Sequence, residues 1–400
     1  MSSYPTPDVY IEAVPPSRPR IVGADASTAG FAGLARDVQM PARPGAFRRS
    51  ADGDLLLDRA GNPIPILYEL AEAGVPRRIA GWDAFRARFG DAQAGNRELA
   101  NAVYGFFNNG GTACWVLRID SDRLPEDLAP TLEAFEAIDE IAIVAVPGAT
   151  ASPQRDAIVA HCAKMQDRVA ILDASQDDRP EPVMAEDGSL DDARSYAALY
   201  GPWIKIIDPV SGQPESFPPS GHIAGVFARS DTRNGVFKAP ANEPLLGAVG
   251  LAEPLGSGAG DRDGRETANL LRPVNGEVRV WGARTLADPA ATAFPYISNR
   301  RYFNFLRESI EEGTQFVVFE PNAPALWQRI RRAANAFLLE QWQLGALFGD
   351  RPSQAFFVKC DEETNPPDVR ARGKVVTEIG VSMVRPAEFV ILRLQQETSG

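Results

Sequence analysis

The sequence has few of the residues from which metal centres and disulfide frameworks are built. Its 400 residues include three cysteines and two histidines. Cys114, Cys162 and Cys360 are far apart, and none has the CxxC spacing of zinc or redox motifs. We therefore expect reduced, buried thiols, as in a protein made in the cytosol, and no structural zinc. His161 and His222 have no Cys or Ser beside them in a motif, which favours structural or surface histidines over catalytic or metal-binding ones.

An excess of basic residues and a long apolar run are also missing. The formal net charge is −12, which argues against a general nucleic-acid binder, because such a protein needs a basic face to displace counterions from phosphate. No apolar stretch approaches the roughly 20 residues that span a bilayer. Residues 1–19 are polar and proline-rich, unlike a secretory signal. We expect a soluble protein of the cytoplasm with no membrane insertion.

Signatures of catalysis are absent as well. The sequence has neither a phosphate-binding GxxxxGK[ST] loop nor a GxSxG nucleophile turn. The glycines of 256–260 do not complete GxGxxG, because the last position is Asp261. Asp261 and Asp263 imitate the start of a calcium loop, but its twelfth position is Arg272. We predict no catalytic residue, no cofactor and no metal; a hydrolase or nucleotide-binding domain is the enzymatic alternative.

The middle of the chain alternates predicted strands and helices. Residues 140–146 form a continuous apolar run, which is typical of a strand covered on both faces. This order favours an α/β unit with a mostly parallel sheet. The predicted strands are 140–146, 168–173 and 203–208, and the predicted helices are 154–166 and 191–199.

The last part of the chain predicts an α+β domain. A helix over 324–347 has an apolar stripe, and strands are predicted over 316–319, 356–358 and 375–384. A glycine-rich loop before residue 276 suggests a domain boundary there. We expect four segments: an N-terminal arm (1–20), an α/β domain (21–272), an α+β domain (273–385) and a C-terminal strand (386–400).

Both termini have the pattern of a strand tethered through proline. The N-terminal segment is a disordered tail or an arm that pairs with the edge of another sheet, and the chain ends on a hydrophobic strand of similar pattern. Their predicted strand residues are Val9, Tyr10, Ile11, Glu12 and Val14 at the N-terminus, and Phe389, Val390, Ile391, Leu392 and Leu394 at the C-terminus.

Three sets of motifs resemble the contractile tail sheath family of myophage tails, R-type pyocin-like particles and extracellular injection systems. The first is PDVYIEAVP (7–15) with IVGADASTAG (21–30), in which Asp8 replaces the family's usual glycine. The second is PPSGHIAGVFARSD (218–231) with GVFKAPAN (235–242). The third and strongest comprises VWGARTL (280–286), YISNRRYF (296–303), ESIEEGTQFVVFEPN (308–322) and PAEFVI (386–391).

The resemblance implies a two-domain sheath subunit with an outer α/β domain and a C-terminal α+β domain. The sheet of the second domain is shared with neighbouring subunits through the terminal strands. Such subunits assemble in the cytoplasm as a six-fold helical sheath around an inner tube, in a particle that can be released from the cell. Baseplate and tail-terminator or cap proteins are the other partners. The sheath assembles in an extended metastable state and contracts to drive the tube through a target envelope.

The resemblance also suggests residue roles. Pro15, Pro16 and Pro386 are expected to act as hinges that keep the strands joined during contraction. Arg329 and Arg332, with Arg331 nearby, are expected to attach the sheath to the tube by charge; a solvated helix face is the alternative. The alternatives for the whole protein are a myophage virion tail sheath and a non-contractile structural protein of capsid type. A type VI secretion sheath is disfavoured, because that sheath is usually split over two chains.

Overall fold

A computed structural model describes residues 20–36, 42–67, 69–175, 191–252, 268–289 and 292–387. These residues form two compact units. The larger unit contains Asp25–Leu306 and the short segment after Val384, and the smaller contains Arg307–Val384 and the chain up to Ala24. The division lies inside helix α7 (Ile297–Gly313). The predicted boundary at 272 falls within a strand of the larger unit.

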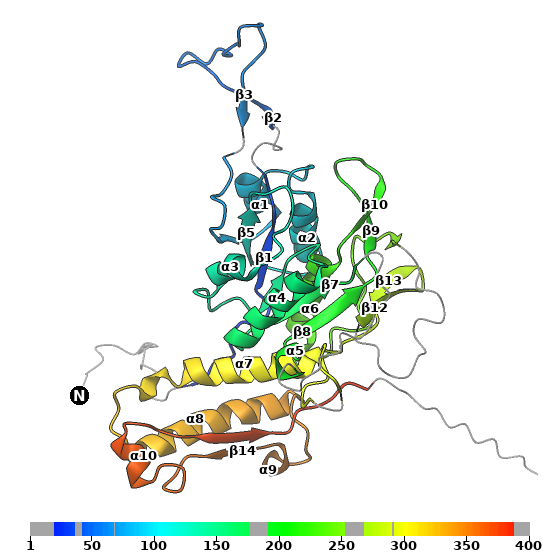
Figure 1. Cartoon of the computed structure of the whole chain (residues 1–400). Coiled ribbons are helices and arrows are strands. Elements are labelled where there is room, and N and C mark those ends of the chain that lie inside the picture. The colour runs from blue at the N-terminus through cyan, green and yellow to red at the C-terminus, as the bar shows by residue number, and fades with distance from the viewer. Residues whose placement is uncertain are drawn as a thin grey trace, which may run out of the picture. The chain divides into compact units, whose positions relative to one another are not determined.

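An eight-stranded sheet is the centre of the larger unit (Figure 1). Its six middle strands run parallel, and an antiparallel strand lies at each edge. The central strands are continuous apolar runs because both faces of the sheet are covered. In sheet order the strands are β13 (Glu277–Val280), β12 (Ala268–Val274), β8 (Ala197–Gly201), β7 (Val169–Asp173), β6 (Ile143–Ala145), β1 (Ala29–Leu34), β5 (Cys114–Ile119) and β4 (Arg77–Ile79).

Helices cover both faces of this sheet, which confirms the predicted α/β class. Alternate strand residues belong to different cores: Ile143 and Ala145 lie in one, and Val144 lies in the other. Helices α2 and α6 close the first core, and α3 and α4 close the second. The helices of this unit are α1 (Trp82–Phe89), α2 (Arg97–Asn108), α3 (Ala129–Leu132), η2 (Glu133–Phe135), α4 (Ser152–Met165), α5 (Asp191–Arg194), α6 (Ser220–Asn234) and the first part of α7.

Two predicted elements of the middle region form, but one lies in a different sheet and the other is shorter than predicted. The predicted strand 203–208 does not join the parallel sheet: β9 (Ile204–Ile207) pairs antiparallel with β10 (Pro214–Phe217) and β11 (Gly250–Leu251). The turn after β9 is too short for a parallel crossover, since the amide of Gly212 already donates to the carbonyl of Asp208 at 2.8 Å. The predicted helix 191–199 ends at Arg194, and its apolar second half is the buried strand β8.

Residues 42–63 are rich in Arg, Gly and Asp, and they are exposed but ordered. They form, with the residues after them, a structure that we call the 42–67 hairpin (Figure 1). β2 (Ala42–Phe47) pairs with β3 (Pro65–Leu67), and further bridges join Arg49 to Leu55 and Leu57 to Pro63. Asp58 accepts hydrogen bonds from the amides at 60 and 62, which closes the second turn.

The smaller unit is built on helix α8 (Pro324–Gln343), which packs against β14 (Phe356–Lys359). Its core contains Leu326, Trp327, Ile330 and Cys360, with Phe316, Val317 and Val375 against them. The other elements are the end of α7, η3 (Gln315–Val317), α9 (Pro352–Ala355), α10 (Pro367–Ala371) and β15 (Glu378–Val381).

The predicted strand 316–319 is wrong. Residues 315–317 form the 3-10 turn η3, because the amide of Val317 bonds back to Thr314 and that of Val318 to Gln315. Phe319 is fully exposed and has a φ of 66°. A β-rich composition alone does not make a strand where no neighbouring strand is available to pair. Within the described ranges, no helix combines the length and apolar character that crossing a membrane requires.

Candidate assembly site

The smaller unit contains a two-stranded sheet with open edges. β14 and β15 pair antiparallel, with Phe356 opposite Val381 and Lys359 opposite Glu378. Among the described residues, neither strand has another strand beside it; the only further bridge nearby joins Leu347 to Met383. A two-stranded sheet is marginal by itself, and its unpaired backbone groups are a template for an added strand.

The surrounding unit fixes the position of this sheet. The amide of Ser382, just after β15, donates to the carbonyl of Ala355 at 2.8 Å, and the carbonyl of Ser382 accepts from Phe348 at 2.7 Å. The fully buried Asn365 bonds both backbone groups of Val376, at 2.7 and 2.9 Å. The sheet is therefore held at both ends, while no other described strand pairs with its long edges.

The chain that enters from the N-terminal segment is anchored in the same unit. Ile21 is 2% exposed and packs on Gly313, where a Cβ atom would lie within 2.9 Å of it. The amide of Ala24 donates to Ser309 Oγ at 2.9 Å, and Arg20 pairs with Glu340 at 3.2 Å. The exposed pair adds little stability, so the packing of Ile21 is the main anchor.

The structure does not describe the two predicted arms. Their strand residues, between Val9 and Val14 and between Phe389 and Leu394, lie outside the described residues, as do Pro15 and Pro16. Pro386 is described and half-buried. The arm and hinge assignments therefore stay predictions.

The three arginines of α8 differ in their surroundings. Arg329 pairs with Glu320 at 2.9 Å and lies over the ring of Phe316. Arg331 donates to the carbonyl of Cys360 at 2.9 Å, so its guanidinium supports the end of β14. Arg332 is exposed and has no ion-pair partner in the part of the chain that the structure describes.

The motif around residue 220 has a structural role. The buried Asp173 at the end of β7 accepts hydrogen bonds from the amide and the hydroxyl of Ser220, both at 2.8 Å, and from the amide of Gly148 at 3.1 Å. Burial raises the pKa of Asp173 to about 7, although these hydrogen bonds oppose the shift. The Pro-Pro-Ser-Gly turn therefore fixes the start of α6 to the sheet.

Two glycines of the same motif allow helices α6 and α2 to pack closely. A Cβ atom at Gly221 would lie 2.3 Å from the carbonyl oxygen of Ala102, and one at Gly225 would lie 2.4 Å from that of Phe106. Larger residues would push the helices apart. The spacing of these glycines is thus explained by packing.

A buried ion pair links the motifs around 231 and 301. Arg301 bonds both carboxylate oxygens of Asp231, at 3.0 and 2.5 Å, and also donates to the carbonyl of Ala26 at 2.8 Å. The side chains of the two residues are 2% and 8% exposed. Arg301 thereby joins α7, α6 and the segment before β1. These motif residues therefore hold elements of the larger unit together.

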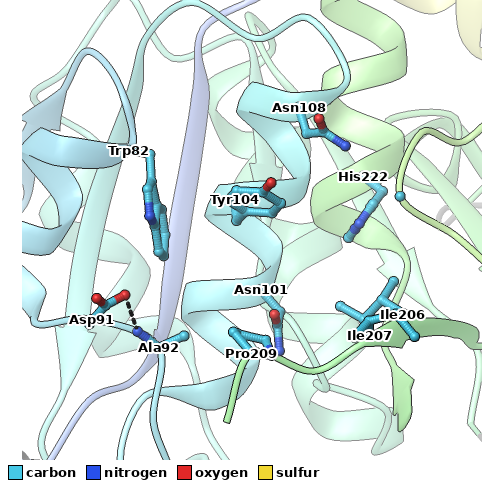
Figure 2. A pocket seen from close by; sticks show the side chains of 11 residues that line it. Trp82, Asp91, Ala92, Asn101, Tyr104, Asn108, Ile206, Ile207, Pro209 and His222 are labelled. Carbon is cyan, nitrogen blue, oxygen red and sulfur yellow. Dashed lines mark hydrogen bonds between the residues drawn. The ribbon is translucent and has the colours of Figure 1, made fainter. Parts of the chain in front are cut away.

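The larger unit also contains a cavity of about 370 Å³ that the sequence did not reveal (Figure 2). Aromatic and aliphatic side chains from α1, α2 and β9 form its walls, and Asn101 and His222 are its buried polar groups. Burial lowers the pKa of His222 to about 4, so its ring is neutral near pH 7. In the described ranges, no group of three or more His, Cys, Asp or Glu side chains could hold a metal.

Comparisons with known proteins agree on one family. The model of the phage tail sheath protein central domain matches residues 125–286, and the model of the phage tail sheath C-terminal domain matches residues 290–397. The tail sheath protein of Vibrio phage KVP40 is 26% identical over 207 residues, which are 51% of this chain and 30% of that protein. The tail sheath protein of Burkholderia phage BcepMu is 27% identical over 207 residues, 49% of this chain and 41% of that protein. The matches thus span less than half of either relative.

Solved structures match over the whole length. A chain in the cryo-EM structure of the anti-feeding prophage helical sheath in its contracted state is 26% identical, with a TM-score of 0.72, and the match covers 99% of this chain and 100% of that one. A chain in the six-fold symmetrised baseplate of the same particle matches with the same identity, TM-score and coverage. The sheath complex of the extracellular injection system PVC, in its contracted state, has the same fold at 24% identity, with a TM-score of 0.72 and coverage of 99% of both chains.

Proposed function

The chain belongs to the contractile tail sheath family, and from that premise we propose that it is the polymer-forming sheath subunit of a phage-tail-like injection system. The observation that carries the proposal is the full-length match to a chain of a contracted helical sheath. The role is structural, and we propose no catalytic one. The phage relatives are matched over less than half of their length. An injection particle is therefore favoured over a myophage virion tail.

We propose that neighbouring subunits complete the sheet of the smaller unit. No other described strand pairs with the edges of β14 and β15. The residues of both strands are only partly buried. Strand residues Val9 to Val14 and Phe389 to Leu394 of other copies would add to these edges and bring directional backbone hydrogen bonds. A contact of this kind that does not close on itself propagates into a helix.

The polymer would have two states. An extended sheath would assemble around an inner tube, held by a baseplate and ended by a cap, and would contract when released. Contraction requires two subunit packings separated by a free-energy gap. Pro15, Pro16 and Pro386 would let the bodies rotate while the strands stay paired. The particle would be assembled in the cytoplasm and could then be released.

The purified chain is expected to form hollow, ridged tubes of uniform diameter, which negative-stain electron microscopy would reveal. Strand addition between copies needs no other protein, so the chain alone is expected to reach the contracted form. Size-exclusion chromatography would measure the remaining monomer. A protein that stayed monomeric at every salt concentration, and also when co-expressed with a tube protein, would refute the sheath proposal.

Arg332→Glu is expected to reduce co-sedimentation of the sheath with tube protein, because it reverses an exposed charge that has no ion-pair partner among the described residues. The loss should be greatest at low salt, where surface charges are least screened. Arg351→Glu, at another site in the same unit, is a control for the general effect of a charge reversal. Equal loading of wild type and Arg332→Glu at every salt concentration would exclude Arg332 from tube attachment.

A further inference from the structure

Two carboxyl groups meet across Gly148, at the carboxyl end of the parallel sheet. Asp173 is the last residue of β7 and is 1% exposed. The amide of Gly148 donates to Asp173 Oδ2 at 3.1 Å. Glu98, in the first turn of α2, approaches the same glycine, because a Cβ atom at Gly148 would lie 2.6 Å from Glu98 Oε2. The two carboxyl groups are therefore separated by one glycine.

No cation neutralises this pair. Among the described residues, Asp173 has no ion-pair partner, and Glu98 has neither an ion pair nor a hydrogen bond. Arg97, beside Glu98 on α2, pairs instead with Asp208 at 2.8 Å and with Glu215. An unpaired charge in a protein interior is strongly disfavoured, and a like charge beside it adds repulsion. This arrangement opposes the ionisation of both carboxyl groups.

The other groups that face Asp173 are uncharged. Asp173 lies on the α2–α6 face of the sheet, because Ile171, two residues earlier, belongs to the core on that face. Tyr200, opposite Asp173 on β8, has its pKa raised by burial and remains a neutral phenol. On α6, Ser220 donates its amide and its hydroxyl to Asp173, both at 2.8 Å, and the buried His222 is neutral near pH 7.

The protonation of Asp173 follows from these surroundings. Burial raises the pKa of Asp173 from 3.8 to about 7, the charge of Glu98 acts in the same direction, and the bonds from Ser220 and Gly148 oppose the shift. Burial also raises the pKa of Glu98, against the effect of Arg97. In the unfolded chain Asp173 would have its ordinary pKa, so between about pH 4 and pH 7 only the folded chain keeps the proton.

We propose that the Asp173–Glu98 pair is a proton-controlled joint, which holds a proton while α6 is attached to the sheet and releases it when the start of α6 detaches. In the protonated form, Asp173 Oδ2 would donate to Ser220 Oγ while Asp173 Oδ1 still accepts from the Ser220 amide. The joint then persists without a buried charge. Acid strengthens it and a rising pH weakens it, and any event that exposes Asp173 to water is coupled to proton release. This inference concerns the single chain and does not depend on the proposed polymer.

Asp173→Asn tests the joint, because an amide resembles the protonated carboxyl and has no proton to lose. Urea unfolding of the full-length wild type and variant is compared from about pH 5.5 to about pH 8.5. The ratio of their unfolding constants, wild type over variant, is expected to rise about tenfold per pH unit up to about pH 7 and then to level off. Titration of the histidines is common to both proteins and cancels in this ratio. A ratio that is the same at every pH would overturn the inference.

Glu98→Gln tests the second member of the pair. It removes the like charge and leaves Asp173 in place, so the wild-type levelling-off point should move to lower pH. Glu126→Gln, at an exposed acid, is the matched control and should leave that point unchanged. An unchanged point in Glu98→Gln would exclude Glu98 from the joint.

Infrared spectroscopy of the wild type provides a measurement that does not require Asp173→Asn to fold. The C=O stretching band of a buried, protonated carboxyl should be present at about pH 6 and should disappear as the pH rises through about 7. Its loss should occur at lower pH in Glu98→Gln. A folded wild type without this band at about pH 6 would refute the inference and leave the proposed function intact.

Discussion

Removal of residues 1–19 is expected to give a folded monomer that forms no tubes at any concentration at which the full chain assembles. The sheet of the smaller unit would then lose an incoming strand, and each lost strand removes a row of intersubunit backbone hydrogen bonds. The monomer should stay folded, because the truncation ends before Ile21, which anchors this end of the chain. Electron microscopy and sedimentation velocity would measure assembly, and thermal unfolding would measure the fold.

A point variant distinguishes the effect of losing the strand from the effect of removing the whole segment 1–19. Ile11→Pro removes one backbone donor from the predicted strand and should block assembly almost as fully as the deletion. Ser3→Pro, outside that strand, is the matched control and should assemble normally. Tubes formed by the truncated chain would show that the N-terminal arm is not the strand that joins subunits.

Arg301→Met is expected to destabilise the larger unit by about 3–5 kcal/mol, the usual effect of removing one partner of a buried ion pair. Asp231 would remain buried without a counter-charge, and the carbonyl of Ala26 would lose its donor. Urea unfolding of the monomer, followed by circular dichroism, would measure the loss as a lower midpoint.

The double variant Arg301→Met/Asp231→Leu shows whether the destabilisation comes from the unpaired buried charge or from lost packing. It should be clearly more stable than Arg301→Met alone, because no unpaired carboxylate remains. Arg332→Met, at an exposed arginine, should leave the midpoint unchanged. If Arg301→Met unfolded at the wild-type midpoint, the ion pair would not contribute to stability.

Much of the larger unit could be predicted because its strands are buried on both faces. The run over 140–146 has no polar alternation, and it lies in the middle of the parallel sheet. The segment 197–201 is equally apolar, but it follows a helix start at Asp191, and the helical pattern hid the strand. Residues 316–319 have strand composition, but no described strand lies beside them. Pairing partners decide such cases, and a single sequence does not reveal them.

The candidate site was predictable to a lesser degree. The arginines of α8 were correctly placed on a helix, but Arg331 bonds a carbonyl of its own unit, which periodicity cannot indicate. The glycines at 221 and 225 were recognised from their motif, and only the structure explains them by close helix packing. The cavity had no signal, because its walls come from segments more than 100 residues apart, such as Trp82 and Ile207.

The anchoring of Ile21 on Gly313 has a mechanical consequence. A pull on the N-terminal arm enters the chain at residue 20 and reaches α7 through that packed contact and the bond from Ala24 to Ser309. β14 and β15, where a neighbour would pull in turn, belong to the same unit. Tension between subunits would therefore run from copy to copy through the smaller units. The parallel sheet of the larger unit lies outside this path from the N-terminal arm to β14 and β15.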